Sequence, residues 1–560
     1  MKRFTQLLGL SVVLVMMLAL VVGVANAQDG DTIIIAWEQE PPTLYPMTNM
    51  AFAAMLEFFY ARGVWDWDYD RNIYPIMVEE IPTLENGMVE TNEDGNTVVT
   101  YKLREGMVWS DGQPITSADC ELYHRLYSDR TTSANIPRGT YPDVVESFEI
   151  VDDLTFRLTY NRPWPDYLVD GYNDCRYPAH IFNPILEAEG TIDNAPYFTG
   201  QGVVGYGPYT FDQWVIGDTM TLNANPNWDG TVPAFETVVI KQIPDASQMV
   251  SAMETGEVDV AFNFADNLVP EYQAIEGVEV FGTPGVFGDA IWINHSDTAH
   301  PALRDINVRR AIAYAIDRPA MAEGLVGPGI EIPKTWYSPL FWPEDLPDPI
   351  PYDPDMANQL LDEAGWVDTN GNGCRDKDGT ELVLRFFTTT RQVRIDYQVL
   401  IQEYLNAVGI CTQLFPVPAG VLFDSFANRG IVNSRDFDLA LYALSASPLS
   451  PNSDPPSFYC SGIASAENPD GQNTTGFCNE EYERLDELVQ TTMDPEERME
   501  YAGEAIKIFT ENTHWIGLYL RVTWYAVNSN VVDPATVEPN LGTLSSNYFN
   551  KIEFWQPAGA

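Results

Sequence analysis

The chain has 560 residues, of which 45% are hydrophobic and 12% aromatic, a composition that excludes a disordered or fibrous protein. It is too long for a single hydrophobic core, so we expect several domains. The formal net charge of −51 at pH 7 excludes a protein that binds nucleic acid or anionic lipid through a basic surface.

The first 27 residues are predicted to direct export. Lys2 and Arg3 form a positive start, residues 7–24 are almost entirely apolar, and residues 25–27 (ANA) fit a signal-peptide cleavage site. No cysteine lies near this site, which argues against a lipoprotein. The apolar stretch is also long enough for an uncleaved anchor, which stays as an alternative. We therefore expect the protein in the periplasm or at the cell exterior.

All six cysteines follow this leader. An even number of cysteines outside the cytosol favours disulfides, and the absence of CxxC spacing argues against zinc. Six cysteines can form disulfides in many different pairings. Proximity in sequence favours Cys120–Cys175, Cys374–Cys411 and Cys460–Cys478.

The first half of the chain alternates strands and helices. Strands are predicted at 32–37, 97–103 and 257–262, and a hairpin at 148–160. Thr116 and Asp119 form a capping-box pattern at the start of one helix, and Asp245 caps another. Strand, helix and strand in this order predict a parallel α/β sheet.

The second half begins with a strand and a helix within residues 288–318. Ile291 and Ile293 face one side of this strand, and Trp292 and Asn294 face the other. An apolar stripe of helical spacing follows at residues 308–316. Further strands are predicted at 382–387, 411–416 and 437–443, then two separate ones at 515–520 and 524–527, with helices at 353–365, 395–408 and from 494 onward.

Four stretches carry a family resemblance: LREGMVWSDGQPITSADC (103–120), GVVGYGPY (202–209), NVRRAIAYAIDR (307–318) and AGWVDTNGNGCRDKDG (364–379). They resemble the extracellular solute-binding proteins of family 5, the oligopeptide, dipeptide and nickel receptors of ABC transporters. The likeness covers nearly the whole mature chain, although Tyr45 and Tyr206 replace the Asp and Thr that are usual in the motifs of this family.

The resemblance implies an α/β fold of the two-lobed, type II periplasmic-binding-protein kind, with an extra α+β subdomain in the first lobe. The expected divisions are a signal peptide (1–27), lobe I (28–57, 201–287 and 523–560), the inserted α+β subdomain (58–200) and lobe II (288–522). Crossings between these parts are expected near 202–208, 283–289 and 521–524.

The implied function is a receptor that closes around a small ligand and delivers it to an ABC transporter permease. It needs no cofactor, and a monomer is expected. An oligopeptide is the favoured ligand, and an oligosaccharide is the alternative because sugar faces pack on aromatic rings. The expected contact residues lie at strand ends or lobe crossings: Trp37, Glu38, Gln39, Tyr206, Trp292, Asn294, Tyr442 and Leu444.

In peptide receptors of this family an Asp in a loop of the second lobe meets the α-amino group of the ligand. The corresponding loop here is 444–457, where Asp454 is the only acid. A buried ammonium needs such a partner because an unpaired charge is costly to desolvate. Asp454, Glu38 or Glu40 is therefore expected to take this role, unless the ligand has no free amine.

Other classes of function were weighed. A secreted hydrolase needs a nucleophile, a metal triad or a distinct carboxylate pair, and the sequence has neither HExxH nor GxSxG. A structural envelope protein would bind no ligand. A nickel site from His295 and His300 is less favoured than loop histidines without metal.

A calcium loop is the last alternative. Asp368, Asn370, Asn372 and Gly373 match the first half of an EF-hand loop, with Asp376 and Asp378 as substitute ligands. Position twelve is Gly379, where a bidentate Glu is needed, so a polar hairpin is the favoured interpretation.

Overall fold

The computed structural model describes residues 31–560 apart from 42, 45–50, 69–71, 137, 139–140, 172, 328–329, 427, 453–456, 466–467, 469–470 and 543–547. The predicted signal peptide and Asp454 therefore lie outside the described residues. None of the described helices is long and apolar enough to cross a membrane.

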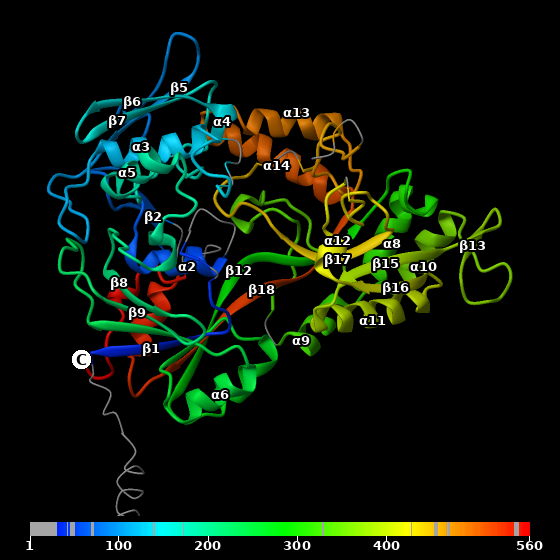
Figure 1. The fold of residues 1–560 in the computed structure, drawn as a ribbon. Helices are drawn as coiled ribbons and strands as arrows, with labels where there is room; N and C mark the ends of the chain where they lie inside the picture. Colours follow the sequence, from blue (N-terminus) through cyan, green and yellow to red (C-terminus); the bar gives the residue numbers. More distant parts are fainter. Residues whose placement is uncertain are drawn as a thin grey trace, which may run out of the picture.

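A single ten-stranded sheet runs through most of the molecule (Figure 1). Its spatial order is β16 (Cys411–Val417), β15 (Val383–Thr389), β17 (Leu439–Ser445), β12 (Val278–Ile293), β18 (Trp515–Asn528), β11 (Val260–Phe262), β1 (Thr32–Trp37), β10 (Thr237–Gln242), β9 (Thr219–Ala224) and β8 (Tyr209–Val215). We call the end with β11, β1, β10, β9 and β8 lobe I, and the end with β17, β15 and β16 lobe II.

Lobe I contains the predicted parallel α/β unit. β1 lies between β10 and β11 and runs parallel to both. The connection from β10 to β11 is α6 (Ala246–Glu254), whose first turn is capped by Asp245 through its contact with the Gln248 amide. The predicted order of strand, helix and strand is confirmed.

Lobe II follows the same logic. β15 is parallel to both β16 and β17, and α11 (Gln392–Ala407) connects β15 to β16. The helix predicted after residue 305 is α8 (Ile306–Ala315), capped by Asp305. Its apolar stripe is fully buried, as expected. The other helices of this lobe are α9 (Arg318–Leu325), α10 (Pro354–Glu363), α12 (Ala419–Leu422), α13 (Glu480–Val489) and α14 (Pro495–Glu511).

Two long antiparallel strands, β12 and β18, join the lobes. At the lobe I end, Val278 of β12 pairs with Asn528 of β18. At the lobe II end, Trp292 of β12 pairs with Trp515 of β18. The prediction of two separate strands at 515–520 and 524–527 was wrong, because β18 continues through Arg521. Polar residues at its centre resemble a loop in sequence, but here they serve the joint between the lobes.

The inserted subdomain has its own four-stranded antiparallel sheet, in the order β4 (Val89–Thr91), β5 (Thr97–Lys102), β7 (Thr155–Tyr160) and β6 (Val145–Asp152). Its helices are α3 (Ser117–Ser128), α4 (Tyr141–Val144) and α5 (Ala179–Glu189). The predicted capping box at Thr116 and Asp119 and the predicted hairpin are both present. Figure 1 shows this subdomain above lobe I, with α13 and α14 beside it.

Short elements complete the chain: α2 (Ala51–Tyr60), β2 (Trp65–Trp67), β3 (Ile73–Pro75), α7 (Val269–Gln273), β13 (Asp376–Lys377), β14 (Thr380–Glu381) and α15 (Pro534–Val537). The hydrophobic cores follow the same division. One core gathers β1, α2, β8–β11 and the C-terminal residues, two fill lobe II on opposite faces of its sheet, and separate ones fill the subdomain. The residue boundaries predicted for the lobes stay a prediction.

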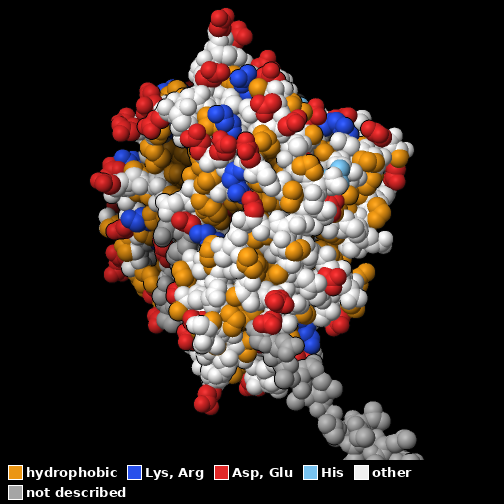
Figure 2. Space-filling model, turned by 90° about the vertical axis from the view of Figure 1, so that its left-hand side faces the viewer, with side chains coloured by type: hydrophobic (Ala, Val, Ile, Leu, Met, Phe, Trp, Pro, Cys, Tyr) orange, Lys and Arg blue, Asp and Glu red, His pale blue; other side chains and the backbone are white. Residues whose placement is uncertain are grey.

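The three predicted disulfides are all present: Cys120–Cys175, Cys374–Cys411 and Cys460–Cys478. The first lies in the subdomain and the other two in lobe II. Acidic side chains are spread over the face seen in Figure 2, with fewer Lys and Arg side chains among them. This agrees with the strongly negative net charge.

Candidate ligand-binding cleft

The joint between the lobes is built around Asp289. This residue lies on β12 next to a register shift in its pairing with β18, and its side chain is fully buried. Its carboxylate accepts hydrogen bonds from Arg394 of α11 at 2.7 Å and from Arg521 of β18 at 2.8 Å. Burial raises the pKa of Asp289, but the two guanidinium groups outweigh burial and hold that pKa below its usual value.

Charged side chains of the two lobes also influence each other electrostatically near this joint. Glu38 directly follows β1 in lobe I, and Arg391 directly precedes α11 in lobe II. Glu38 is exposed at its surface, but the surrounding protein partly desolvates its carboxylate and raises its pKa, and the nearby Arg391 opposes that rise. Burial likewise raises the pKa of Asp266 in lobe I, opposed by a hydrogen bond from Trp524 and by Arg391. Acids of lobe I and Arg391 of lobe II are thus near enough to influence each other's charge.

A second contact lies where the inserted subdomain meets lobe II. Asp166 of the subdomain pairs with Arg498 of α14 at 2.6 Å, and their side chains are 7% and 13% exposed. Asn452, in the loop predicted to hold the ligand, donates to the same carboxylate at 2.5 Å. The two parts of the chain thus touch through a largely buried ion pair next to that loop.

Three of the predicted contact residues lie close to solvent. Glu38 and Gln39 follow β1 and are exposed, as expected for side chains after the carboxyl end of a parallel strand. Leu444, at the end of β17, is 40% exposed and lines a cavity of about 230 Å³. These three positions are compatible with ligand contact, and their role stays a prediction.

Two others lie in the core around lobe I and the subdomain. Trp37 is buried, and its ring stacks on Phe549. The Tyr206 hydroxyl is held by Asp229 and Arg104, each at 2.6 Å, where the subdomain joins lobe I. The glycines beside Tyr206 are required by close packing, since a Cβ atom at Gly205 would lie 2.0 Å from the carbonyl oxygen of Tyr60.

The remaining three are buried in lobe II. Trp292 stacks on Tyr442, with ring centroids 5.1 Å apart, and both are nearly inaccessible. The Asn294 amide donates to the backbone oxygens of Arg435 and Phe437. We expected a ligand site at this strand end, but that rule holds for parallel strands, and β12 is antiparallel to both of its neighbours.

Sequence reasoning missed the residues that build the joint: Asp289, Arg391, Arg394 and Arg521. No local pattern marks them, because they come from three elements far apart in the chain. The available signal was that basic residues are scarce, since the chain has 30 Lys and Arg residues against 81 Asp and Glu residues. Several arginines near a predicted crossing are therefore unusual.

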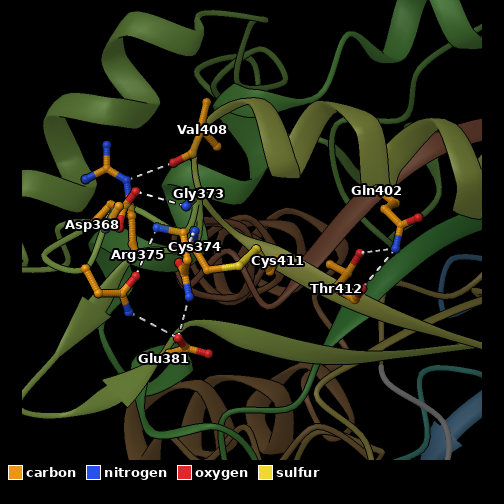
Figure 3. Close-up of a disulfide and its surroundings, with 12 residues drawn as sticks. Asp368, Gly373, Cys374, Arg375, Glu381, Gln402, Val408, Cys411 and Thr412 are labelled. Atoms are coloured by element: carbon orange, nitrogen blue, oxygen red, sulfur yellow. Dashed lines mark hydrogen bonds between the residues drawn. A yellow bond between two sulfur atoms is a disulfide. The ribbon is translucent and has the colours of Figure 1, made fainter.

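The loop that resembled an EF-hand is held by its own hydrogen bonds (Figure 3). The Asp368 carboxylate accepts from the Gly371 and Gly373 amides at 2.7 and 3.0 Å, and the Asn372 side chain donates to Glu381 at 2.6 Å. Asp376 binds the Thr369 hydroxyl and amide.

The side chains that would bind calcium, those of Asp368, Asn370, Asn372 and Asp376, are thus engaged in hydrogen bonds within the loop, as in the favoured polar hairpin. The hairpin is also tied to β16 by the disulfide Cys374–Cys411.

The histidines considered for nickel have different surroundings. His300 binds the backbone oxygen of Glu381 at 3.0 Å and accepts from the Ala302 amide at 3.3 Å. Burial lowers the pKa of His295 to about 4. Within the described part of the chain there is no cluster of three or more His, Cys, Asp or Glu side chains that could hold a metal ion.

Comparison with known families is decisive here. Residues 72–466 match the profile of the bacterial extracellular solute-binding proteins, family 5 Middle. The chain belongs to this family. The expected fold class, a two-lobed α/β fold with an added α+β subdomain, is confirmed by the architecture described above and by solved structures of the same fold.

Among curated proteins, the oligopeptide-binding protein AppA of Bacillus subtilis is 29% identical over 336 residues, which are 57% of this chain and 58% of that protein. The structure of AppA from Bacillus subtilis in complex with a nonapeptide superposes with a TM-score of 0.70 at 20% identity, covering 94% of this chain and 99% of AppA.

NikZ of Campylobacter jejuni, solved with Ni(L-His), gives a TM-score of 0.71 at 20% identity, covering 94% of this chain and 99% of NikZ. At these identities the structural likeness establishes the fold, while the ligands of these family 5 proteins differ.

Proposed function

We propose that this family 5 protein is an exported receptor that binds a peptide between its lobes and delivers it to an ABC transporter permease. The observation that carries the proposal is the joint at β12 and β18, the long antiparallel pair that connects the two lobes and is held by Asp289, Arg394 and Arg521. A ligand that contacts both lobes stabilises the closed form, because only there do both faces reach it. The peptide-binding name and nonapeptide complex of AppA support the choice of ligand.

The proposal includes the predicted division of the chain. Residues 28–57, 201–287 and 523–560 form lobe I, residues 58–200 the inserted subdomain and residues 288–522 lobe II. The leader is removed near Ala27, and the mature receptor acts as a monomer outside the cytoplasm. It binds its ligand without transforming it, so a hydrolase is the competing class.

Recognition of the peptide amine falls to one of three acids in this proposal. The Glu40 carboxylate is already engaged by the Trp214 indole at 2.5 Å and by the Gly217 amide at 2.9 Å. Glu38 is exposed beside the joint. Asp454 lies outside the described residues, but its neighbour Asn452 is in contact with the subdomain. Asp454 and Glu38 are therefore the better candidates.

The test is to identify the ligand. Mass spectrometry of the small molecules released by denaturing the purified protein should find peptides. Calorimetry with mixed dipeptides to pentapeptides should show saturable binding, and the peptides should be recovered unchanged after long incubation. Binding of oligosaccharides alone would end the peptide assignment, and cleaved peptides would support the hydrolase.

A further inference from the structure

The cavity beside Leu444 is built on a missing side chain. Gly288 of β12 pairs with Leu444 of β17 on one side and with Leu520 of β18 on the other. Residues directly opposite each other in antiparallel strands point to the same face of the sheet. The two leucines therefore flank a position that has no side chain, and the cavity of about 230 Å³ lies over it.

The opposite wall is the segment of residues 331–342, which crosses over this row. A Cβ atom at Gly288 would lie 3.6 Å from Leu520, 3.7 Å from Trp515 and 4.0 Å from Pro333. All three residues line the cavity, so a side chain added at Gly288 would grow into it. These separations are ordinary van der Waals contacts, and the first added atom meets no clash.

The walls are mainly apolar and aromatic, with Glu331, Thr335 and Ser338 as their polar side chains. Trp336, Trp342 and Trp515 line the cavity together with Leu444 and Leu520, and no Lys or Arg is among its described lining residues. Two polar groups of the wall are turned to the protein itself, since the Trp342 indole donates to the Tyr337 carbonyl oxygen at 2.9 Å and the Tyr337 hydroxyl binds that of Tyr482.

The size of the cavity fits one large side chain. A cavity of about 150 Å³ is sufficient to hold benzene in a protein core. The larger volume here admits a benzyl or indolyl group, and flat rings pack well on the aromatic walls. Leu444 is 40% exposed, so the wall can be reached from solvent, and it begins the loop expected to hold the ligand.

We propose that this cavity is a specificity subsite that takes one bulky apolar side chain of the peptide ligand, an aromatic one in preference to a small one. The proposal rests on the proposed receptor function and adds what the ligand must carry. Gly288 determines the subsite, because its missing side chain creates the space.

The experiment uses tripeptide pairs that differ by Ala or Phe at one position, with calorimetry on the full mature protein. Wild type should bind the Phe peptide at least about tenfold more tightly at one of the positions, which corresponds to about 1.4 kcal/mol. Gly288→Leu should abolish this preference by lowering the affinity for the Phe peptide to about that for the Ala peptide. Gly288→Ala, which adds one methyl group, is the matched control and should keep most of the preference.

The outcomes separate the two proposals. Equal affinity of wild type for Phe and Ala peptides at every position would overturn the subsite and leave the receptor intact, as would an equal loss for both peptides in Gly288→Leu. If no peptide binds at all, the receptor proposal fails and the cavity is tested with indole alone. Indole should then raise the melting temperature of wild type but not of Gly288→Leu, and no effect on wild type would overturn the site. If Gly288→Leu does not fold, Leu444→Gln replaces it and should reduce the preference for Phe.

Discussion

At the scale of single residues, His514 links pH to stability. Its ring is fully buried, stacked on Phe477 at 4.5 Å and against Phe509 at 4.4 Å, and neither ring nitrogen has a hydrogen-bond partner among the described residues. Burial holds the pKa of His514 well below its usual value, and the nearby His295 and Arg309 lower it further.

A histidine with a lowered pKa in the folded state makes the unfolded state bind more protons in mild acid. The contribution of the neutral His514 to the free energy of unfolding is therefore fully present above about pH 6.5 and is lost as the pH falls below that value. When the pH falls from 8 to 5, we expect the free energy of unfolding of wild type to decrease by about 1–2 kcal/mol more than that of His514→Phe, which keeps an aromatic ring at this position. Urea unfolding at both pH values measures this difference.

The control is His180→Phe, because the His180 side chain is 31% exposed and pairs with Asp111 at the surface. It should not reproduce the effect of His514→Phe. If His514→Phe and wild type lose the same free energy in acid, His514 does not titrate as its burial implies.

At the scale of elements, local chemistry made much of the fold predictable. Caps such as Asp245 and Asp305, and the apolar stripe of α8, act within a few residues, so the sequence displays them directly. The continuity of β18 was not predicted because Arg521 interrupts its apolar pattern. Only the tertiary contact with Asp289 explains an arginine at this position.

The candidate site was less predictable for the same reason. Strand-end residues were expected to meet the ligand, and for Glu38 after the parallel β1 this stays compatible with its exposure. At Trp292 the rule for parallel strands does not apply, because β12 is antiparallel to its neighbours and strand direction is not visible in one segment. The cavity over Gly288 depends on a register across three strands, and no short stretch of sequence records that register.

The disulfides allow a prediction at this scale. Cys460 and Cys478 are 18 residues apart, and Cys374 and Cys411 are 37 apart. In the chain-entropy model a bridge of the shorter span stabilises by about 3 kcal/mol, and each doubling of the loop adds about 0.6 kcal/mol. Replacing both cysteines of a pair by serine should thus cost slightly more for Cys374–Cys411. Denaturant unfolding measures the two losses, and peptide mapping without reductant that finds free thiols at Cys460 and Cys478 would contradict the pairing.

At the scale of the whole molecule, the contact of Asp166 with Arg498 and Asn452 is a latch between the subdomain and lobe II. In the proposed hinge mechanism its partners belong to parts of the chain that separate when the lobes open. In an open form each charged group would regain water, so losing the pair affects the closed form alone. Asp166→Asn should therefore weaken closure without a comparable loss of folding stability.

The expected size follows from the loss of a charge-assisted contact, about 1.5–3 kcal/mol, or about 10- to 100-fold in ligand affinity. Small-angle scattering should show wild type contracting when ligand is added, as a two-lobed receptor must. At the ligand concentration that saturates wild type, Asp166→Asn should keep a larger radius of gyration. Glu481→Gln is the matched control, because it removes the same charge from a pair with Arg484 in which both side chains are more than half exposed. A variant at Asp166 that binds ligand and contracts like wild type would show that the latch contributes nothing to closure, and an unchanged radius in wild type at saturation would contradict the two-lobed mechanism itself.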